Sequence, residues 1–131
     1  MIYLLDVNAL VALGFAEHIF HHRVAVWLQS HRPPELATCS ITELGFVRVL
    51  AQAPMYGLTI AQARSVLARM KQSPLVRFRF FADALDLSHL PAWVKAPKQL
   101  TDGHLVELAA ANGSILATLD ENIPSAYVIP K

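Results

Sequence analysis

The stretch Ile2-Tyr3-Leu4-Leu5-Asp6 decides the fold, because it is a short apolar run that ends at a carboxylate. A continuously apolar strand is typical of a parallel sheet whose two faces are both covered. The stretch Ile115-Leu116-Ala117-Thr118-Leu119-Asp120 has the same form near the other end of the chain. The two stretches together predict buried parallel strands, each followed directly by an aspartate.

The rest of the chain alternates between strand-like and helix-like segments, which is the pattern of an α/β fold with helices on both sides of a parallel sheet. Proline at 91 and 97 predicts an irregular segment over residues 82–98, and Pro33-Pro34 ends a helix. The helix at 40–52 is apolar nearly all round and is expected to be buried on several sides. We expect strands at residues 2–5, 36–39, 76–81, 114–119 and 126–129, and helices at residues 8–15, 18–30, 40–52, 60–73 and 101–112.

Length and composition limit the class of protein. A chain of 131 residues fits a single domain, residues 1–131, with one core. Apolar residues make up 54% of the chain and charged residues 16%, which excludes intrinsic disorder. No segment has the roughly 18 uninterrupted apolar residues of a membrane span. The apolar fraction is high for a monomer, so we expect some apolar surface to be shared with a partner.

Charge, cysteine content and the first residues narrow the function further. The formal net charge is +1, so a nucleic-acid site would depend on how charge is distributed. The single cysteine, Cys39, excludes an internal disulfide framework and a cysteine-based zinc site. The first residues lack a basic segment, and Asp6 interrupts the apolar run, so no secretory signal is expected. The sequence predicts a cytoplasmic protein.

Four acidic residues stand where an acid is least expected. Asp6 and Asp120 directly follow strands, Glu43 lies in the first turn of an apolar helix, and Asp102 begins the helix after the irregular segment. In an open parallel sheet, the carboxyl ends of the strands and the amino ends of the following helices share one edge, where ligands bind. We therefore expect the four carboxylates to converge.

Each of these acids also has an ordinary structural explanation. Asp6 can cap the next helix, and Glu43 can close a capping box with Ser40. Asp102 can complement a helix dipole, and Asp120 can be a turn residue. Four separate explanations that all fall on one edge of one sheet are a weaker account than a shared site.

Clustered carboxylates repel one another and stay ionised only when positive charge neutralises them. Oxygen ligands without a Cys/His set indicate Mg²⁺ or Mn²⁺. Such ions activate water and stabilise charge on the oxygens of a phosphodiester. Hydrolysis of a nucleic-acid backbone is therefore the chemistry that this acidic set favours.

These motifs together resemble those of the PIN-domain ribonucleases, and the segment around Glu43 is most similar to the VapC toxins of bacterial toxin–antitoxin pairs. The resemblance extends over nearly the whole chain, and the order and spacing of the motifs agree. The segments that carry it are Leu4-Leu5-Asp6-Val7-Asn8-Ala9-Leu10, Thr42-Glu43-Leu44-Gly45-Phe46-Val47-Arg48, Thr101-Asp102 and Thr118-Leu119-Asp120.

The resemblance implies a parallel sheet between helices and an endoribonuclease that depends on Mg²⁺ or Mn²⁺. It also implies a two-fold homodimer and an antitoxin protein whose tail covers the acidic crevice. Asn8 matches a polar position beside the first acid, and Thr118 matches a hydroxyl that supports the site. The segment Glu121-Asn122-Ile123-Pro124 departs from the aromatic or basic residues that often follow the fourth acid. The acidic quartet that binds the metal and performs catalysis corresponds to Asp6, Glu43, Asp102 and Asp120.

The sequence also permits other interpretations of the function and of several polar residues. A PIN-fold module that has lost activity and only binds RNA or a protein is the main rival, although the presence of all four acids argues against it. The spacing of His18, His21 and His22 suits a transition metal on a helix, but a solvated or partner-facing patch is the better interpretation. His104, near Asp102, is more simply a surface residue. Basic side chains could contact phosphates or belong to an ordinary solvated face: Arg64, Arg69, Lys71, Arg77 and Arg79.

Overall fold

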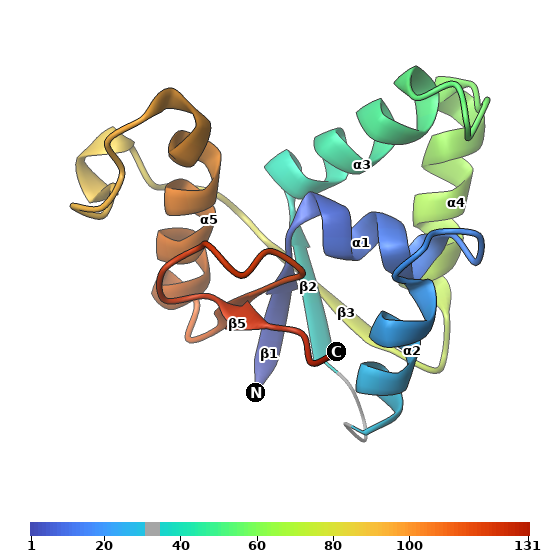
Figure 1. Ribbon diagram of the computed structural model, residues 1–131, viewed down its shortest axis with the longest axis horizontal. Coiled ribbons are helices and arrows are strands. Elements are labelled where there is room, and N and C mark those ends of the chain that lie inside the picture. Colours follow the sequence, from blue (N-terminus) through green and yellow to red (C-terminus); the bar gives the residue numbers. More distant parts are fainter. Residues whose placement is uncertain (31–34) are drawn as a thin grey trace.

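The computed structural model describes residues 1–30 and 35–131, and its centre is a five-stranded sheet. Figure 1 shows this sheet with the helices around it. The spatial order of the strands is β3-β2-β1-β4-β5, and every pairing is parallel. The expected fold class is confirmed. Pro33-Pro34 lies outside the described residues. The strands are β1 (Ile2–Leu5), β2 (Glu35–Cys39), β3 (Arg77–Phe81), β4 (Ile115–Thr118) and β5 (Tyr127–Val128).

Helices cover both faces of the sheet, as Figure 1 shows, with α5 on one side and the other four helices on the other. The second helix begins three residues later than the sequence predicts, because His18 lies in a turn and its ring accepts a hydrogen bond from the Phe20 amide. The segment 82–98 holds only two short 3₁₀ turns, at Leu87–His89 and Pro97–Gln99. The helices are α1 (Val7–Gly14), α2 (His21–Gln29), α3 (Ser40–Gln52), α4 (Ile60–Gln72) and α5 (Leu100–Ala111).

Alternation along the strands builds the two halves of the core. In β1, Leu5 packs with α1 to α4, whereas Leu4 packs with α5, and both side chains are fully buried. In β4, Ala117 and Leu116 divide in the same way. Successive side chains of a strand point to opposite faces, so a strand with helices on both sides must be largely apolar. Among the described residues, no helix is long and apolar enough to cross a membrane.

Helix α3 has the predicted bounds but not the predicted burial. Only Thr42, Phe46 and Leu50 are buried, and they lie on one side of the helix at a spacing of four residues. Leu44 is 64% exposed. The apolar residues of this helix therefore cover two different surfaces, one inside the core and one open.

Helices α1 and α3 approach each other closely where the chain leaves β1 and β2. A Cβ atom at Gly45 would collide with the side chain of Val7. Valine has a stiff side chain, since its branch at Cβ leaves few rotamers. The absence of a side chain at Gly45 thus sets the separation of the two helices that follow the first two strands.

The close approach yields a stability prediction. We expect Gly45→Ala to lower the free energy of unfolding by about 1–2 kcal/mol, because an overpacked methyl group costs more than the better helix propensity of alanine returns. In a Val7→Ala background, the same change should be neutral or stabilising. Urea unfolding of the four proteins measures the coupling, and an equal cost in both backgrounds would contradict this account.

Candidate functional site

Asp6 is a buried carboxylate, 7% exposed, at the junction of β1 and α1. One oxygen, Oδ1, accepts a hydrogen bond from the Ala9 amide at 2.9 Å and so caps α1. The other oxygen, Oδ2, accepts a short hydrogen bond from the hydroxyl of Thr118. The capping explanation is thus correct for this residue, but it uses only one of the two oxygens. The second oxygen ties β1 to the end of β4.

The electrostatics of Asp6 link it to two further acids. Burial has the largest influence and raises the pKa of Asp6 above its ordinary value. The hydrogen bonds from Thr118 and the Ala9 amide lower that pKa, while the charges of Asp102 and Asp120 raise it again. The net direction is upward. The ionised carboxylate is therefore held in a position that disfavours its charge.

Asp102 and Asp120 reach this edge from the two elements that flank the α5–β4 turn. Asp102 lies in the first turn of α5, and partial burial followed by the charge of Asp120 raises its pKa. Asp120 follows β4, is exposed, and accepts a hydrogen bond from the Asn122 amide at 2.8 Å, as expected of a turn residue. Its own amide donates to the Thr118 hydroxyl at 3.0 Å. Thr118 therefore contacts both Asp6 and the backbone of Asp120.

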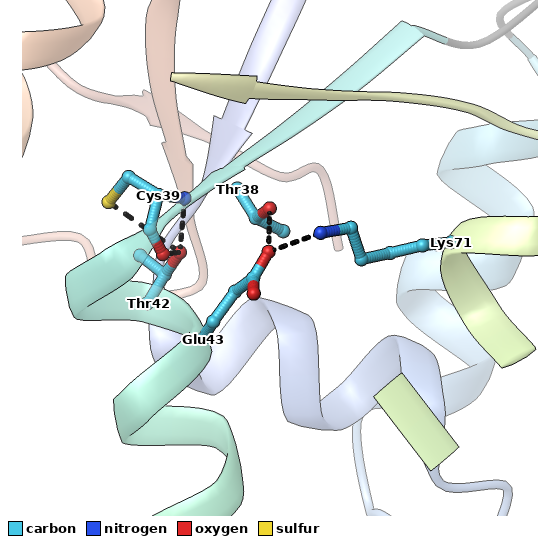
Figure 2. A network of polar contacts seen from close by, with 5 residues as sticks. All are labelled: Thr38, Cys39, Thr42, Glu43 and Lys71. Carbon is cyan, nitrogen blue, oxygen red and sulfur yellow. Dashed lines mark hydrogen bonds and ion pairs between the residues drawn. The ribbon is translucent and has the colours of Figure 1, made fainter. Parts of the chain in front are cut away.

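Glu43 has a different environment (Figure 2). Its Oε2 atom accepts a hydrogen bond from the Thr38 hydroxyl at 2.6 Å and pairs with the Lys71 ammonium, also at 2.6 Å. The alternative explanation of Glu43, a capping box with Ser40, is wrong, because the Cys39 amide donates instead to Thr42 Oγ1 at 3.0 Å. Shifting the cap by one residue leaves the Glu43 side chain outside it.

The structure thus brings three of the four predicted acids within electrostatic reach of one another and gives the fourth a cation of its own. Within residues 1–30 and 35–131, no three His, Cys, Asp or Glu side chains are grouped closely enough to hold a metal ion. The available donors are nevertheless carboxylate oxygens, which Mg²⁺ and Mn²⁺ prefer. Burial and, after it, the charge of neighbouring carboxylates raise the pKa of Asp6 and Asp102, and a nearby cation would relieve the second of these effects.

Asn8 is the second residue of α1, is exposed, and lines a cleft together with Asp120 and Leu119. The other walls of the cleft come from the end of α1, the turn before α2 and the end of α3. Most of these side chains are apolar, so the cleft joins a polar end near the acids to a longer apolar part. The apolar residues are Val11, Phe15, Ile19, Phe20, Val49, Ala53, Met55 and Tyr56.

The histidines lie outside the acidic set. His21 Nδ1 contacts the Ala12 carbonyl at 2.7 Å, and no metal-binding group forms around it within the described part of the chain. His104 pairs with Asp83, a partnership that the sequence did not reveal. The pair ties α5, two residues beyond Asp102, to the segment after β3.

The contacts that Thr38 and Lys71 make with Glu43 were not predicted from the sequence. Thr38 is fully buried one position before the end of β2, where a hydroxyl needs a polar partner. The polar Thr38 inside an otherwise apolar stretch was the sequence signal that this residue has a specific partner. Lys71 was one basic residue among several, and only the pairing of α3 with α4 brings it to Glu43.

Comparisons with known proteins agree on one family. Residues 3–128 match the PIN domain. Ribonuclease VapC38 of Mycobacterium tuberculosis is 40% identical over 124 residues, which cover 92% of this chain and 86% of the relative. Ribonuclease VapC44 of the same organism is 35% identical over 131 residues, with 92% and 87% covered.

Solved structures agree on the fold. The crystal structure of Mycobacterium tuberculosis VapC20, described as a Sarcin-Ricin loop cleaving toxin, matches with a TM-score of 0.68 at 17% identity and covers 99% of this chain and 100% of the other. VapBC2 from Rickettsia felis, bound to a DNA fragment from its promoter, matches with a TM-score of 0.57 at 16% identity, with 97% and 96% covered.

The raised pKa of Asp6 predicts a stability pattern. Folding is opposed by this group as the pH rises from the ordinary value of 3.8 through the higher value in the folded state, and the penalty is complete only above that higher value. Asp6→Asn removes the charge but keeps an oxygen for the Ala9 amide. We therefore expect this variant to be at least as stable as the parent at neutral pH, with the difference vanishing below pH 3.8.

Asp6→Ala is the matched control, because it removes both the charge and the cap. It should be about 1 kcal/mol less stable than Asp6→Asn, the usual cost of a lost cap. Thermal and urea unfolding at several pH values compare the three proteins. A parent that gains stability relative to Asp6→Asn as the pH rises would contradict the direction of the shift.

Proposed function

Because this chain belongs to the PIN-domain family, we propose that it is a divalent-metal-dependent endoribonuclease, the toxin of a toxin–antitoxin pair. The proposal treats residues 1–131 as a single PIN domain that acts in the cytoplasm on RNA phosphodiester bonds. Its relatives named as VapC ribonucleases are 32–40% identical over most of the chain, which supports the ribonuclease activity.

The observation that carries the proposal is that the Thr118 hydroxyl contacts both the Asp6 carboxylate and the Asp120 amide, while the charges of Asp102 and Asp120 add to burial in raising the pKa of Asp6. Repulsion among carboxylates costs stability, so a protein that only needed helix caps would not gather them. A site of this kind is useful where a cation and a negatively charged substrate must be brought together.

The acids proposed to bind Mg²⁺ or Mn²⁺ and to perform catalysis are Asp6, Glu43, Asp102 and Asp120. When bound, such an ion supplies positive charge that stabilises the negative charge developing on phosphate oxygens. The chain's own contribution is orientation. Thr118 and the Ala9 amide fix both oxygens of Asp6, and Thr38 fixes one oxygen of Glu43. Asn8 is proposed as a supporting polar side chain on the substrate side, where it shares the cleft with Asp120.

The rival function, an inactive module that only binds RNA or protein, has no support. The four acids of the proposed site are all present, and the similar proteins are named as ribonucleases.

An antitoxin is the proposed protein partner. The cleft that begins at Asn8 and Asp120 continues along apolar side chains that include Phe15, Phe20 and Tyr56. A tail that orders on binding could cover this apolar surface and, at its polar end, the acids. The structural neighbour VapBC2 is itself a complex, which supports a partner of this kind.

A homodimer is proposed for the isolated chain. Leu44 on α3 is 64% exposed and Ile60 on α4 is 63% exposed, so both helices present apolar side chains to solvent. A two-fold pair would bury the same patch on both copies at once. Light scattering at micromolar concentration should give twice the 14.5 kDa of one chain, and a monomeric mass would contradict this part of the proposal.

Cleavage of labelled RNA tests the activity. We expect Asp102→Asn and Asp120→Asn to lose cleavage by at least about a hundredfold, because each removes charge that the reaction centre requires. Mn²⁺ should raise the melting temperature of the parent more than that of either variant, by mass action.

Glu121→Gln is the matched control for these variants. Glu121 is the neighbour of Asp120 in sequence, but it is exposed and pairs with Lys131 at 2.9 Å. Its replacement should leave cleavage unchanged. Full cleavage by both aspartate variants would overturn the acidic site, and cleavage of RNA by the parent in excess chelator would overturn the metal dependence.

A further inference from the structure

Glu43 is the one acid of the proposed site with a cationic partner in the part of the chain that the structure describes. The Lys71 ammonium lies 2.6 Å from Glu43 Oε2, and the two side chains are only 31% and 23% exposed. The same ammonium lies 5.4 Å from the centre of the Phe80 ring. Lys71 is therefore held from two sides and is not a freely moving surface lysine.

Two donors of different character converge on a single carboxylate oxygen. Thr38 donates a neutral hydroxyl to Oε2, and Lys71 donates a charged ammonium to the same atom, as Figure 2 shows. Across the described residues, no hydrogen bond or ion pair to Glu43 Oε1 is found. One oxygen of Glu43 is thus fixed by protein groups, and the other is left for a ligand.

We propose that the Lys71 ammonium is a built-in competitor of the divalent cation at Glu43, whereas the Thr38 hydroxyl orients the same carboxylate for that cation. This inference rests on the proposed metal-dependent function and deepens it, since it names the group that sets how tightly the site binds metal. Lys71 acts through Glu43 and is a positioning residue in this account.

Lys71 and Thr38 act on a divalent cation at Glu43 with opposite sign. A divalent cation on Glu43 lies within a few ångströms of the Lys71 ammonium, and like charges at that range repel strongly in a half-buried site. Lys71 must move away or share the carboxylate, and both outcomes weaken metal binding. The Thr38 hydroxyl carries no net charge, so its hydrogen bond only reduces the motion of Glu43, which strengthens metal binding.

The two partners of one oxygen are therefore expected to have opposite effects when they are removed. Lys71→Met keeps most of the length of an unbranched apolar side chain while removing the charge. Thr38→Val keeps the shape of a buried side chain while removing the hydroxyl. A merely structural role for both residues would weaken metal binding in both variants.

Calorimetric titration of the folded protein with Mn²⁺ in the absence of RNA measures these effects. Lys71→Met should bind Mn²⁺ on the order of tenfold more tightly than the parent, and Thr38→Val should bind it several-fold more weakly. Arg69→Met, which removes a cation from the exposed side of the same helix, should bind Mn²⁺ like the parent. Lys71→Arg keeps the charge and should remain close to the parent.

The possible results distinguish failure of the competition by Lys71 from failure of the proposed metal-dependent function. Unchanged or weaker Mn²⁺ binding by Lys71→Met, with Arg69→Met unchanged, would overturn the competition while leaving the metal-dependent function in place. Absence of Mn²⁺ binding in the parent and in all variants would overturn the proposed function and the inference together. If Thr38→Val fails to fold, Thr38→Ala, which also lacks the hydroxyl, replaces it, and Thr38→Ser, which keeps the hydroxyl, should bind Mn²⁺ like the parent. Parent-like or tighter Mn²⁺ binding by the variant without the hydroxyl would overturn the orienting role.

Discussion

The hydrogen bond between Thr118 and Asp6 is the interaction on which the rest of the site depends. A carboxylate that is 7% exposed is costly unless both oxygens have partners, and here one partner is the amide of Ala9 while the other is a hydroxyl from a neighbouring strand. The same hydroxyl accepts from the amide of Asp120, so the position of a second acid is set by the contact that stabilises the first. The contacts of Asp6 and Thr118 therefore join the pairing of β1 with β4, the capping of α1 and the position of Asp120.

The arrangement of strands and helices was predictable because it follows from patterns that act locally. Apolar strands such as β1 and β4 must be buried on both faces, and the aspartates after them mark the same edge of the sheet. The capping box of Thr59 and Gln62 at the start of α4 is likewise fixed by residues three positions apart. The expectation that acids converge needed only the general rule that parallel strands share a carboxyl edge.

What the sequence could not reveal are contacts between elements whose relative position is set by packing. The pairing of Lys71 with Glu43 requires the last turn of α4 to lie beside the first turn of α3, and no local pattern encodes that. The partial exposure of α3 was missed for a similar reason, because hydrophobicity alone does not say which apolar residues face the core. The helix cap of α3 also lies one residue earlier than the capping box of Ser40 and Glu43 would place it. The Cys39 amide donates to Thr42, so the Glu43 side chain is free to accept a hydrogen bond from Thr38. A difference of one residue in the position of the cap thus decides whether Glu43 caps the helix or contacts Thr38 and Lys71.

The strand order has a consequence for how the chain folds during its synthesis on the ribosome. The central strand β1 is synthesised first, but Thr118, which holds the carboxylate at its end, is 112 positions further along the chain. Asp102 and Asp120 are also made late. A nascent chain that has emerged only as far as α4 therefore has Asp6 and Glu43 but neither the hydroxyl nor the two other acids that accompany Asp6. Contacts of such large sequence separation form slowly, so the acidic site is among the last features to appear, and unfinished chains are unable to assemble it near the machinery that makes them.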